Sequence, residues 1–457
     1  MDDIASTVPE DNDREVLPVN GRRSRASTIS RLGATVLATS AMGYVLIIGA
    51  GKYLSSADNA IFLAFWGLLM GVGSALSPVE QELSRQTAAA AARGNRPDLS
   101  VTRTIAVTQM VAIAVAVLLA APIVHAQLFG RHRDLAVVAG IGIVMFPALY
   151  AIRGLFIGAA QNGRYSALLL TEAGVRLALF TGFIVAGISG LTWLAVAVTA
   201  GSCAWLPFAF RARGMVETSI PGEPWSALWR RMLGLIASSG LTASVLTGYP
   251  AVVKLAAPPG SEEMLGGLFL AVSLLRSPLL LALSPIQTLA VPTVVRVLHQ
   301  PDGGRRLNRI VAAGAGATLI IGLIVGAVAY VVGPWVFHLL HVFHLLHDDK
   351  VTVPAWTMTG LGWSGIMLVA TMLAVAVLVA RRQTGRVVTV WAAVAALSLL
   401  VVLLLPGSIM FRAVLGATVA PTVGLIIALL MVVTTRDATS PVGLTQDGCA
   451  NAGRPLR

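Results

Sequence analysis

The sequence predicts an all-α polytopic membrane protein with about 12 transmembrane helices in two six-helix lobes. Of its 457 residues, 56% are hydrophobic and only 12% are charged, and the mean hydropathy is +0.80. Soluble domains carry about twice that share of charge. The composition therefore cannot cover a water-facing surface, and it excludes a cytosolic enzyme, a secreted disulfide scaffold and a disordered chain.

Apolar stretches long enough to cross a bilayer follow one another along the chain. A polar segment separates the first six from the last six. The expected spans are 32–53, 59–79, 104–129, 135–160, 166–188 and 191–210, then 232–256, 265–295, 310–333, 353–380, 387–405 and 411–433.

This pattern divides the chain into five parts. Trp225 and Trp229 lie four residues apart beside two arginines, which is typical of a short helix in the headgroup region. The expected parts are a polar tail (1–31), a six-helix lobe (32–210), a linker with an interfacial helix (211–231), a second six-helix lobe (232–433) and a second tail (434–457).

The distribution of basic residues predicts the orientation. Most of the 33 lysines and arginines fall in the tails and in alternate loops, which places both termini in the cytoplasm of a multi-pass protein of the inner (plasma) membrane. The strongly basic charge is then a topology signal, so nucleic acid is not expected as a partner. The outer side receives only Lys52, Arg131, Arg133, Lys350 and Arg412.

A faint internal repeat supports two related lobes. Leu32-Gly33, Gly43-Tyr44 and Lys52 recur in the same order as Leu233-Gly234, Gly248-Tyr249 and Lys254. Six helices per copy would give both lobes the same orientation in the membrane, with a substrate path between them.

Charged residues inside the spans are the strongest candidates for function, because such residues usually face a bundle interior or a water-filled cavity. Glu172 and Arg176 have the spacing of an ion pair on one helical face, which is open to a purely structural interpretation. Arg153 and Lys254 lie near span ends, where they could also reach the interface. Arg276 lies deep in its span without an acidic neighbour, so water, another helix or an anionic ligand must satisfy it.

These candidates comprise four bases and one acid, which predicts a cationic interior. Such an interior would favour an anionic passenger, for example a lipid with a pyrophosphate head group. The first span has no Asp or Glu, so it has no carboxylate for a coupling ion.

Two further motifs leave alternatives open. Glu80 and Glu82 follow the second span, either as a solvated helix end or as a gate that pairs with basic inner loops. Val336–His341 is repeated directly as Val342–His347. Because histidines three residues apart drift around a helix, a duplicated helix end explains this repeat better than a metal site. Neither a metal nor a cofactor is expected.

The segment Lys52–Ala60, running into Phe62–Trp66, resembles a feature of the Wzx-type polysaccharide flippases. Their superfamily also contains the MATE drug exporters and the lipid II flippases. The resemblance implies a transporter that moves a polyprenyl-linked, phosphate-bearing saccharide from the inner to the outer leaflet during cell-envelope polysaccharide biosynthesis. It also implies cationic residues in a central cavity, with Arg276 and Arg153 as the best candidates.

The leading hypothesis is therefore a flippase for lipid-linked oligosaccharide that works by alternating access and is not an enzyme. Membrane lipid is an expected partner, together with the polysaccharide polymerase and glycosyltransferases of the same pathway. Two alternatives remain. One is an integral membrane polysaccharide polymerase or glycosyltransferase, for which Asp348 and Asp349 are the outer-loop acids. The other is a MATE-like drug exporter.

Overall fold

The computed structural model describes residues 19–217, 222–276, 294, 297, 303–342, 353–381 and 383–434. Every regular element in these residues is helical, so the predicted all-α membrane fold is confirmed. Ten helices are long and apolar enough to cross a membrane, and a bent pair, α10 with α11, raises the number to 11. The eighth predicted span, 265–295, lies partly outside the described residues, which contain its first part as a helix at 262–276.

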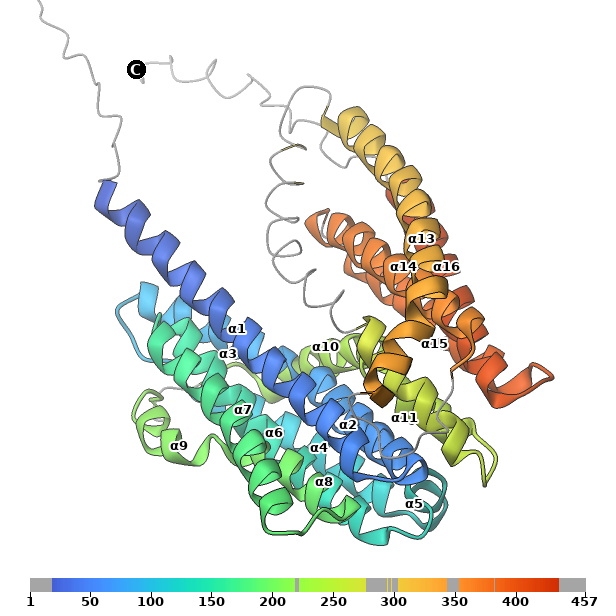
Figure 1. The fold of residues 1–457 in the computed structure, drawn as a ribbon. Helices are drawn as coiled ribbons and strands as arrows, with labels where there is room; N and C mark the ends of the chain where they lie inside the picture. The colour runs from blue at the N-terminus through green and yellow to red at the C-terminus, as the bar shows by residue number, and fades with distance from the viewer. Residues whose placement is uncertain are drawn as a thin grey trace, which may run out of the picture.

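The predicted spans agree with the observed helices, although several helices are longer or are broken at a proline. In chain order, the α-helices labelled in Figure 1 and their bounds are α1 (Val19–Tyr53), α2 (Ser56–Leu76), α3 (Pro78–Ala92), α4 (Ser100–Ala120), α5 (Pro122–Phe129), α6 (Arg133–Gly158), α7 (Asn162–Val185), α8 (Leu191–Ala200), α9 (Leu206–Arg213), α10 (Trp225–Leu246), α11 (Tyr249–Ala256), α13 (Gly303–Val342), α14 (Ala355–Ala380), α15 (Thr384–Leu404) and α16 (Ile409–Val433).

Three differences from the prediction have local causes. Helix α1 begins at Val19, inside the segment expected to be a polar tail. Pro78 and Pro122 each occupy the first turn of a new helix, where the missing N–H costs nothing, so α3 follows α2 and α5 follows α4 at these points. Trp225 is the first residue of α10, so the expected interfacial helix is the start of a spanning helix rather than a separate element.

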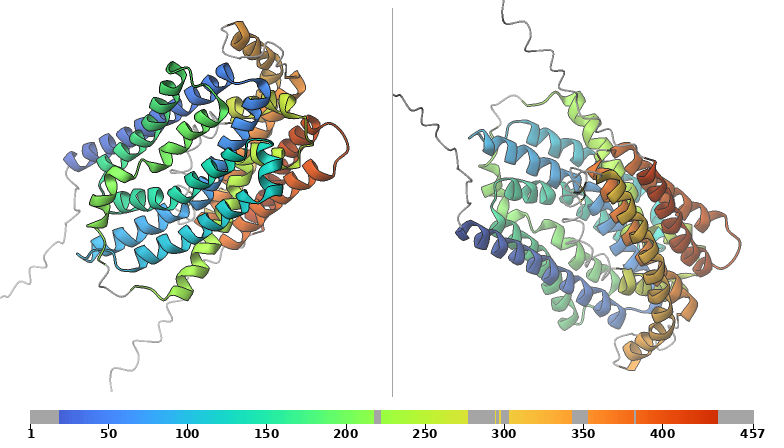
Figure 2. Two further views of the ribbon diagram at one scale, coloured as in Figure 1. Left: turned by 90° about the horizontal axis from the view of Figure 1, so that it is seen from below. Right: turned by 90° about the horizontal axis from the view of Figure 1, so that it is seen from above.

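The helices form two groups (Figure 1). Helices α1–α9 make up the first group, and α10, α11 and α13–α16 make up the second, with α10 and α11 on the side toward the first group. One hydrophobic core runs through the first group and continues into the second, where Ala329, Met358 and Ala413 belong to it, and a smaller core lies within the second group. The two further views show the same division (Figure 2). In Figure 1 the groups lie close together near α11 and the start of α2, and they diverge toward the ends where α1 and α13 begin.

The two groups make a close backbone contact at a glycine crossing. Helices α10 and α11 meet at an angle of 76° around Thr247 and Gly248. Gly67 and Gly71, one turn apart on α2, face this bend, and a Cβ on Gly71 would lie 2.9 Å from the Gly248 Cα. Small residues at this spacing allow helices in membranes to approach backbone to backbone.

Candidate functional site

A cavity of about 340 Å³ lies where the two groups of helices meet. Helix α1 supplies most of its wall, from Thr39 to Ile47, and Trp66 of α2 and Arg176 of α7 extend it. Thr247, at the end of α10, brings the second group of helices to the same wall. The lining therefore combines apolar side chains, hydroxyl groups and one guanidinium, and a ligand in this cavity would contact both groups.

Arg176 belongs to a buried network of four charged side chains. Arg153 of α6 and Arg176 each donate to one oxygen of Glu172, and the Arg176 Nη2 to Glu172 Oε1 distance is 2.6 Å. Arg153 Nη1 also lies 3.9 Å from Glu80 Oε2, while the Tyr165 hydroxyl donates to the other Glu80 oxygen at 3.1 Å. The formal charges of two acids and two bases cancel, which is what burial within a membrane favours.

Local structure fixes the position of Arg176. Glu172 and Arg176 are one turn apart on α7, so they share a face. The Arg176 Nε donates at 3.0 Å to the carbonyl of Val198, in the last turn of α8, where helical carbonyls lack their own donors. A Cβ on Gly201 would lie 2.3 Å from that Nε, so glycine is required there. The hydrogen bonds from Arg176 to Glu172 and to Val198 use its Nη2 and Nε atoms, and neither uses Nη1.

The structure thus brings together three of the five predicted site residues, Arg153, Glu172 and Arg176. Of these, Arg176 lines the cavity that both groups share. The i,i+4 ion pair inferred from the sequence is present, and Arg153 joins it from a neighbouring helix instead of extending to the interface.

Arg276, the leading candidate from the sequence, lies 100 residues beyond Arg176 in the chain and has a different environment. Its side chain is 2% exposed, and Nη2 donates to Ser364 Oγ at 2.6 Å. The guanidinium also stacks over the Tyr249 ring, 5.0 Å from its centroid. The sequence left water, another helix or an anionic ligand as partners for this cation. Among the described residues, its partners are groups on other helices.

Backbone carbonyls explain why an arginine is suitable at position 276. It approaches the carbonyl of Val245 at 3.5 Å, in the last turn of α10 before the bend. It also approaches the carbonyl of Ala417 at 3.4 Å. Ala417 lies four residues before Pro421, which has no N–H to donate to that carbonyl. Arg276 therefore serves two helix irregularities, in a setting where bilayer lipid offers no replacement donors.

Lys254, the fifth candidate, forms an ion pair near the outer end of the predicted topology. Its Nζ donates to Glu262 Oε1 at 2.6 Å, and its side chain is buried instead of extending to the interface. Partial burial acts to raise the pKa of Glu262, which lies outside the spans, but the hydrogen bond and charge of Lys254 outweigh it and lower the pKa below 4.5.

The predicted cationic interior is not what the described residues contain. Arg153, Arg176 and Lys254 all have carboxylate partners, and two of these partners, Glu80 and Glu262, lie outside the spans expected from the sequence. Sequence reasoning singled out Glu80 but not its pairing with Arg153, because it ended the second span at 79, whereas the helical segment of α2 and α3 continues to Ala92. A longer second span would have placed this carboxylate among the span residues.

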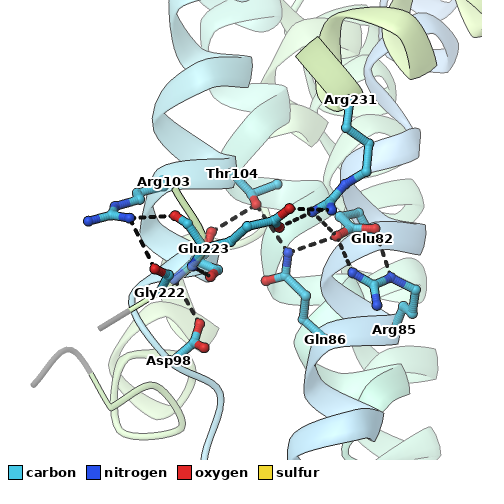
Figure 3. Close-up of polar contacts among 10 residues, drawn as sticks. Glu82, Arg85, Gln86, Asp98, Arg103, Thr104, Gly222, Glu223 and Arg231 are labelled. Carbon is cyan, nitrogen blue, oxygen red and sulfur yellow. Dashed lines mark hydrogen bonds and ion pairs between the residues drawn. The ribbon is translucent and has the colours of Figure 1, made fainter. Parts of the chain in front are cut away.

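Glu82 contributes to a second network at the opposite end of α2 from the Lys254 pair. Arg231 of α10 lies 2.8 Å from Glu82 and 2.7 Å from Glu223 of the linker, and Arg85 lies 2.7 Å from Glu82 (Figure 3). Glu82 is buried. A solvated helix end therefore does not describe Glu82, which pairs with the basic residues Arg85 and Arg231. Glu80 instead pairs with Arg153 of α6, so the two carboxylates do not share one basic segment.

The fold is that of the MATE transporters. The chain superposes on the inward-facing conformation of a multidrug resistance MATE family transporter of the MOP superfamily with a TM-score of 0.59 at 13% identity, over 88% of this chain and 98% of that one. For the eukaryotic MATE transporter AtDTX14 the TM-score is 0.58 at 16% identity, over 91% and 97% of the two chains. The chain is thus a multi-pass membrane protein with a transporter fold.

Sequence relatives define the family. The chain is 30% identical over 417 residues to the uncharacterized protein Rv1510 of Mycobacterium tuberculosis, which covers 88% of this chain and 90% of Rv1510. It is 28% identical over 349 residues to the uncharacterized protein Mb3654 of Mycobacterium bovis, over 74% and 77% of the two chains. No family model matches the sequence. The chain belongs to the same family as Rv1510.

Proposed function

We propose that this transporter moves a polyprenyl-linked, phosphate-bearing saccharide from the inner to the outer leaflet by alternating access. The observation that carries the proposal is the cavity at the meeting of the two helix groups, whose wall holds one guanidinium, that of Arg176. An arginine binds phosphate through a planar set of donors. In this cavity Arg176 takes the head-group role that the sequence assigned to Arg276.

The rest of the cavity wall suits an amphiphile. Thr39, Ser40 and Thr247 provide hydroxyl groups for a saccharide, while Leu46 and Trp66 provide apolar surface. Helix α1 has its cavity face on one side and exposed apolar residues on the other, including Leu37. A head group could therefore occupy the cavity while its lipid tail stays in the bilayer beside α1.

The conformation supports loading from the cytoplasmic leaflet. The helix groups diverge toward the end where α1 begins (Figure 1), and the distribution of basic residues predicts that this end lies in the cytoplasm. The chain also superposes less well on the outward-facing conformation of a MATE family transporter, with a TM-score of 0.51. A substrate made on the inner membrane surface would meet this form first. The enzymes that make and polymerise such a substrate remain its expected partners in the plasma membrane.

A second candidate function is drug export, which is the role that its name gives the multidrug resistance MATE family transporter. Glu80 and Glu172 favour it, because carboxylates in the first helix group could bind a coupling ion. Against it, Glu172 already accepts from two arginines. Drug-resistance measurements on an overexpressing strain separate the two functions, since only the exporter raises the tolerated drug concentration.

The test uses two glycines of α1 as a matched pair. A Cβ on Gly43 would point toward Trp66, 3.9 Å away, so Gly43→Leu extends into the cavity. A Cβ on Gly33 meets nothing within 4 Å, so Gly33→Leu adds the same side chain outside it. In proteoliposomes with a fluorescent polyprenyl-diphosphate saccharide, we expect Gly43→Leu to lower the rate of leaflet exchange at least tenfold and Gly33→Leu to leave it unchanged.

Arg176→Lys and Arg176→Gln complete this test. Lysine keeps the charge but not the planar donor set, so it should retain part of the exchange that glutamine loses. Wild-type protein that does not exchange this lipid, or a Gly43→Leu variant that exchanges it at the wild-type rate, would show that the proposed substrate or its site is wrong.

A further inference from the structure

The seam between α4 and α10 carries an apolar groove on the outside of the bundle, separate from the cavity at Arg176. The groove has a volume of about 330 Å³. It runs along α4 from Met110 to Leu118, which is about 12 Å of helix axis, and Trp229 and Leu233 of α10 form its other side. Ala114, in the middle of its floor, is exposed.

Two arginines lie at the end of this groove where both helices begin. Arg103 is two turns before Met110 on the same face of α4. Arg230 follows Trp229 on α10 and is exposed. Both helices run in the same direction through the membrane in the predicted topology, so both arginines lie at its cytoplasmic surface.

The charge at this end is not neutralised by the neighbouring network. Arg231 and Arg85 take up the carboxylates Glu82 and Glu223, as Figure 3 shows. Arg103 points away from this cluster and donates to the linker carbonyls of Gly222 and Glu223. Among the described residues, neither Arg103 nor Arg230 forms an ion pair with a carboxylate.

Two tryptophans indicate how deep in the membrane the groove lies. Trp225 and Trp229 are one turn apart on α10, and the Trp225 side chain is 44% exposed. Tryptophan is enriched where the headgroup region meets the hydrocarbon. The groove thus begins in the headgroup region and continues into the apolar part of the membrane, with positive charge only at its headgroup end.

We propose that this seam is a binding site for an anionic phospholipid of the inner leaflet. Its phosphate lies between Arg103 and Arg230, and one acyl chain follows the groove from Trp229 toward Leu118. Charge complementarity favours this occupant over a zwitterionic lipid, because each basic residue near a membrane surface raises the affinity for an anionic lipid about fivefold. The bound lipid joins α4 of the first helix group to α10 and stabilises the conformation in which they touch.

Trp229 permits a direct test in nanodiscs of wild-type protein. Bromine atoms on an acyl chain in the groove would quench the fluorescence of Trp229, which is isolated by subtracting the signal of a Trp229→Phe variant. We expect brominated phosphatidylglycerol to quench Trp229 with several-fold greater apparent affinity than brominated phosphatidylcholine. Equal quenching by the two lipids at the same mole fraction would overturn the proposal.

Three variants test the parts of the site separately. Arg230→Gln should reduce the preference for phosphatidylglycerol over phosphatidylcholine about fivefold, and among the described residues no side-chain bond is lost with it. Arg164 is an exposed arginine at the start of α7, and Arg164→Gln should leave this preference unchanged. Ala114→Phe should abolish quenching by filling the groove while both charges remain. Undiminished preference in Arg230→Gln, or undiminished quenching in Ala114→Phe, would refute this site. None of these measurements depends on the transported substrate.

Discussion

Glu172 is the carboxylate on which the buried charge network depends. Two arginines from two helices donate to it, so Glu172→Gln keeps the shape of the side chain but leaves Arg153 and Arg176 facing a neutral group. Removing one partner of a buried ion pair costs about 3–5 kcal/mol. A loss of this size would lower the folded-to-unfolded ratio by a factor of about 150 to 5,000, and native proteins are stable by only about 5–15 kcal/mol.

The assay is unfolding in mixed detergent micelles, titrated with a denaturing detergent and followed by tryptophan fluorescence. Glu263→Gln is the matched control, because Glu263 is exposed and its substitution should change the free energy of unfolding by less than about 0.5 kcal/mol. A Glu172→Gln variant within about 1 kcal/mol of wild type would refute the conclusion that this carboxylate holds the network together.

A second substitution separates charge balance from shape. Glu172→Gln combined with Arg153→Gln leaves one acid, Glu80, and one base, Arg176, so the formal charges cancel again. The double variant should be less destabilised than the sum of the two single variants, by about 0.5–3 kcal/mol. Strict additivity would show that the four side chains do not act as one unit.

Two other predictions concern the remaining buried bases. Arg276→Met should destabilise the protein by about 1–3 kcal/mol, because the carbonyl of Val245 loses its donor, and the same unfolding titration measures it; no loss would mean that another group satisfies that carbonyl. The Glu262 pKa is lowered in the folded state, so its ion pair with Lys254 contributes stability above pH 4.5 that is lost as the pH falls through the folded pKa. The midpoint temperature of thermal unfolding should therefore fall more steeply between pH 6 and pH 3 in wild type than in Glu262→Gln. Parallel curves for the two proteins would contradict this.

The approximate bounds of most helices could be predicted from the sequence, because a membrane span is defined locally by its own run of apolar residues. The described residues contain 10 or 11 candidate spans against the 12 expected, and the remaining expected span, 265–295, lies partly outside them. Breaks were harder. The expected span 232–256 runs straight through the bend between α10 and α11, although Gly248 lies at the break and Pro250 is in the first turn of α11. Glycine and proline are common in transmembrane helices, so neither of them predicts a bend by itself.

The candidate site could be predicted only in part, for a related reason. The pair of Glu172 and Arg176 follows from spacing on one helix, so it was accessible. The addition of Arg153 and Glu80 depends on which helix faces meet, and the sequence alone does not fix that. Arg276 was the opposite case: the lack of a nearby acid suggested a ligand, but the groups that it serves are backbone carbonyls on distant helices, which no sequence motif records.

The glycine crossing between α2 and the α10–α11 bend has a consequence for how this family can vary. Gly71 and Gly248 are far apart in the sequence, yet Gly71 cannot gain a methyl group, because a Cβ at 71 would lie 2.9 Å from the Gly248 Cα. Main-chain atoms have no rotamers with which to make room. In an alignment of relatives, position 71 should therefore remain glycine wherever the helices cross at this point.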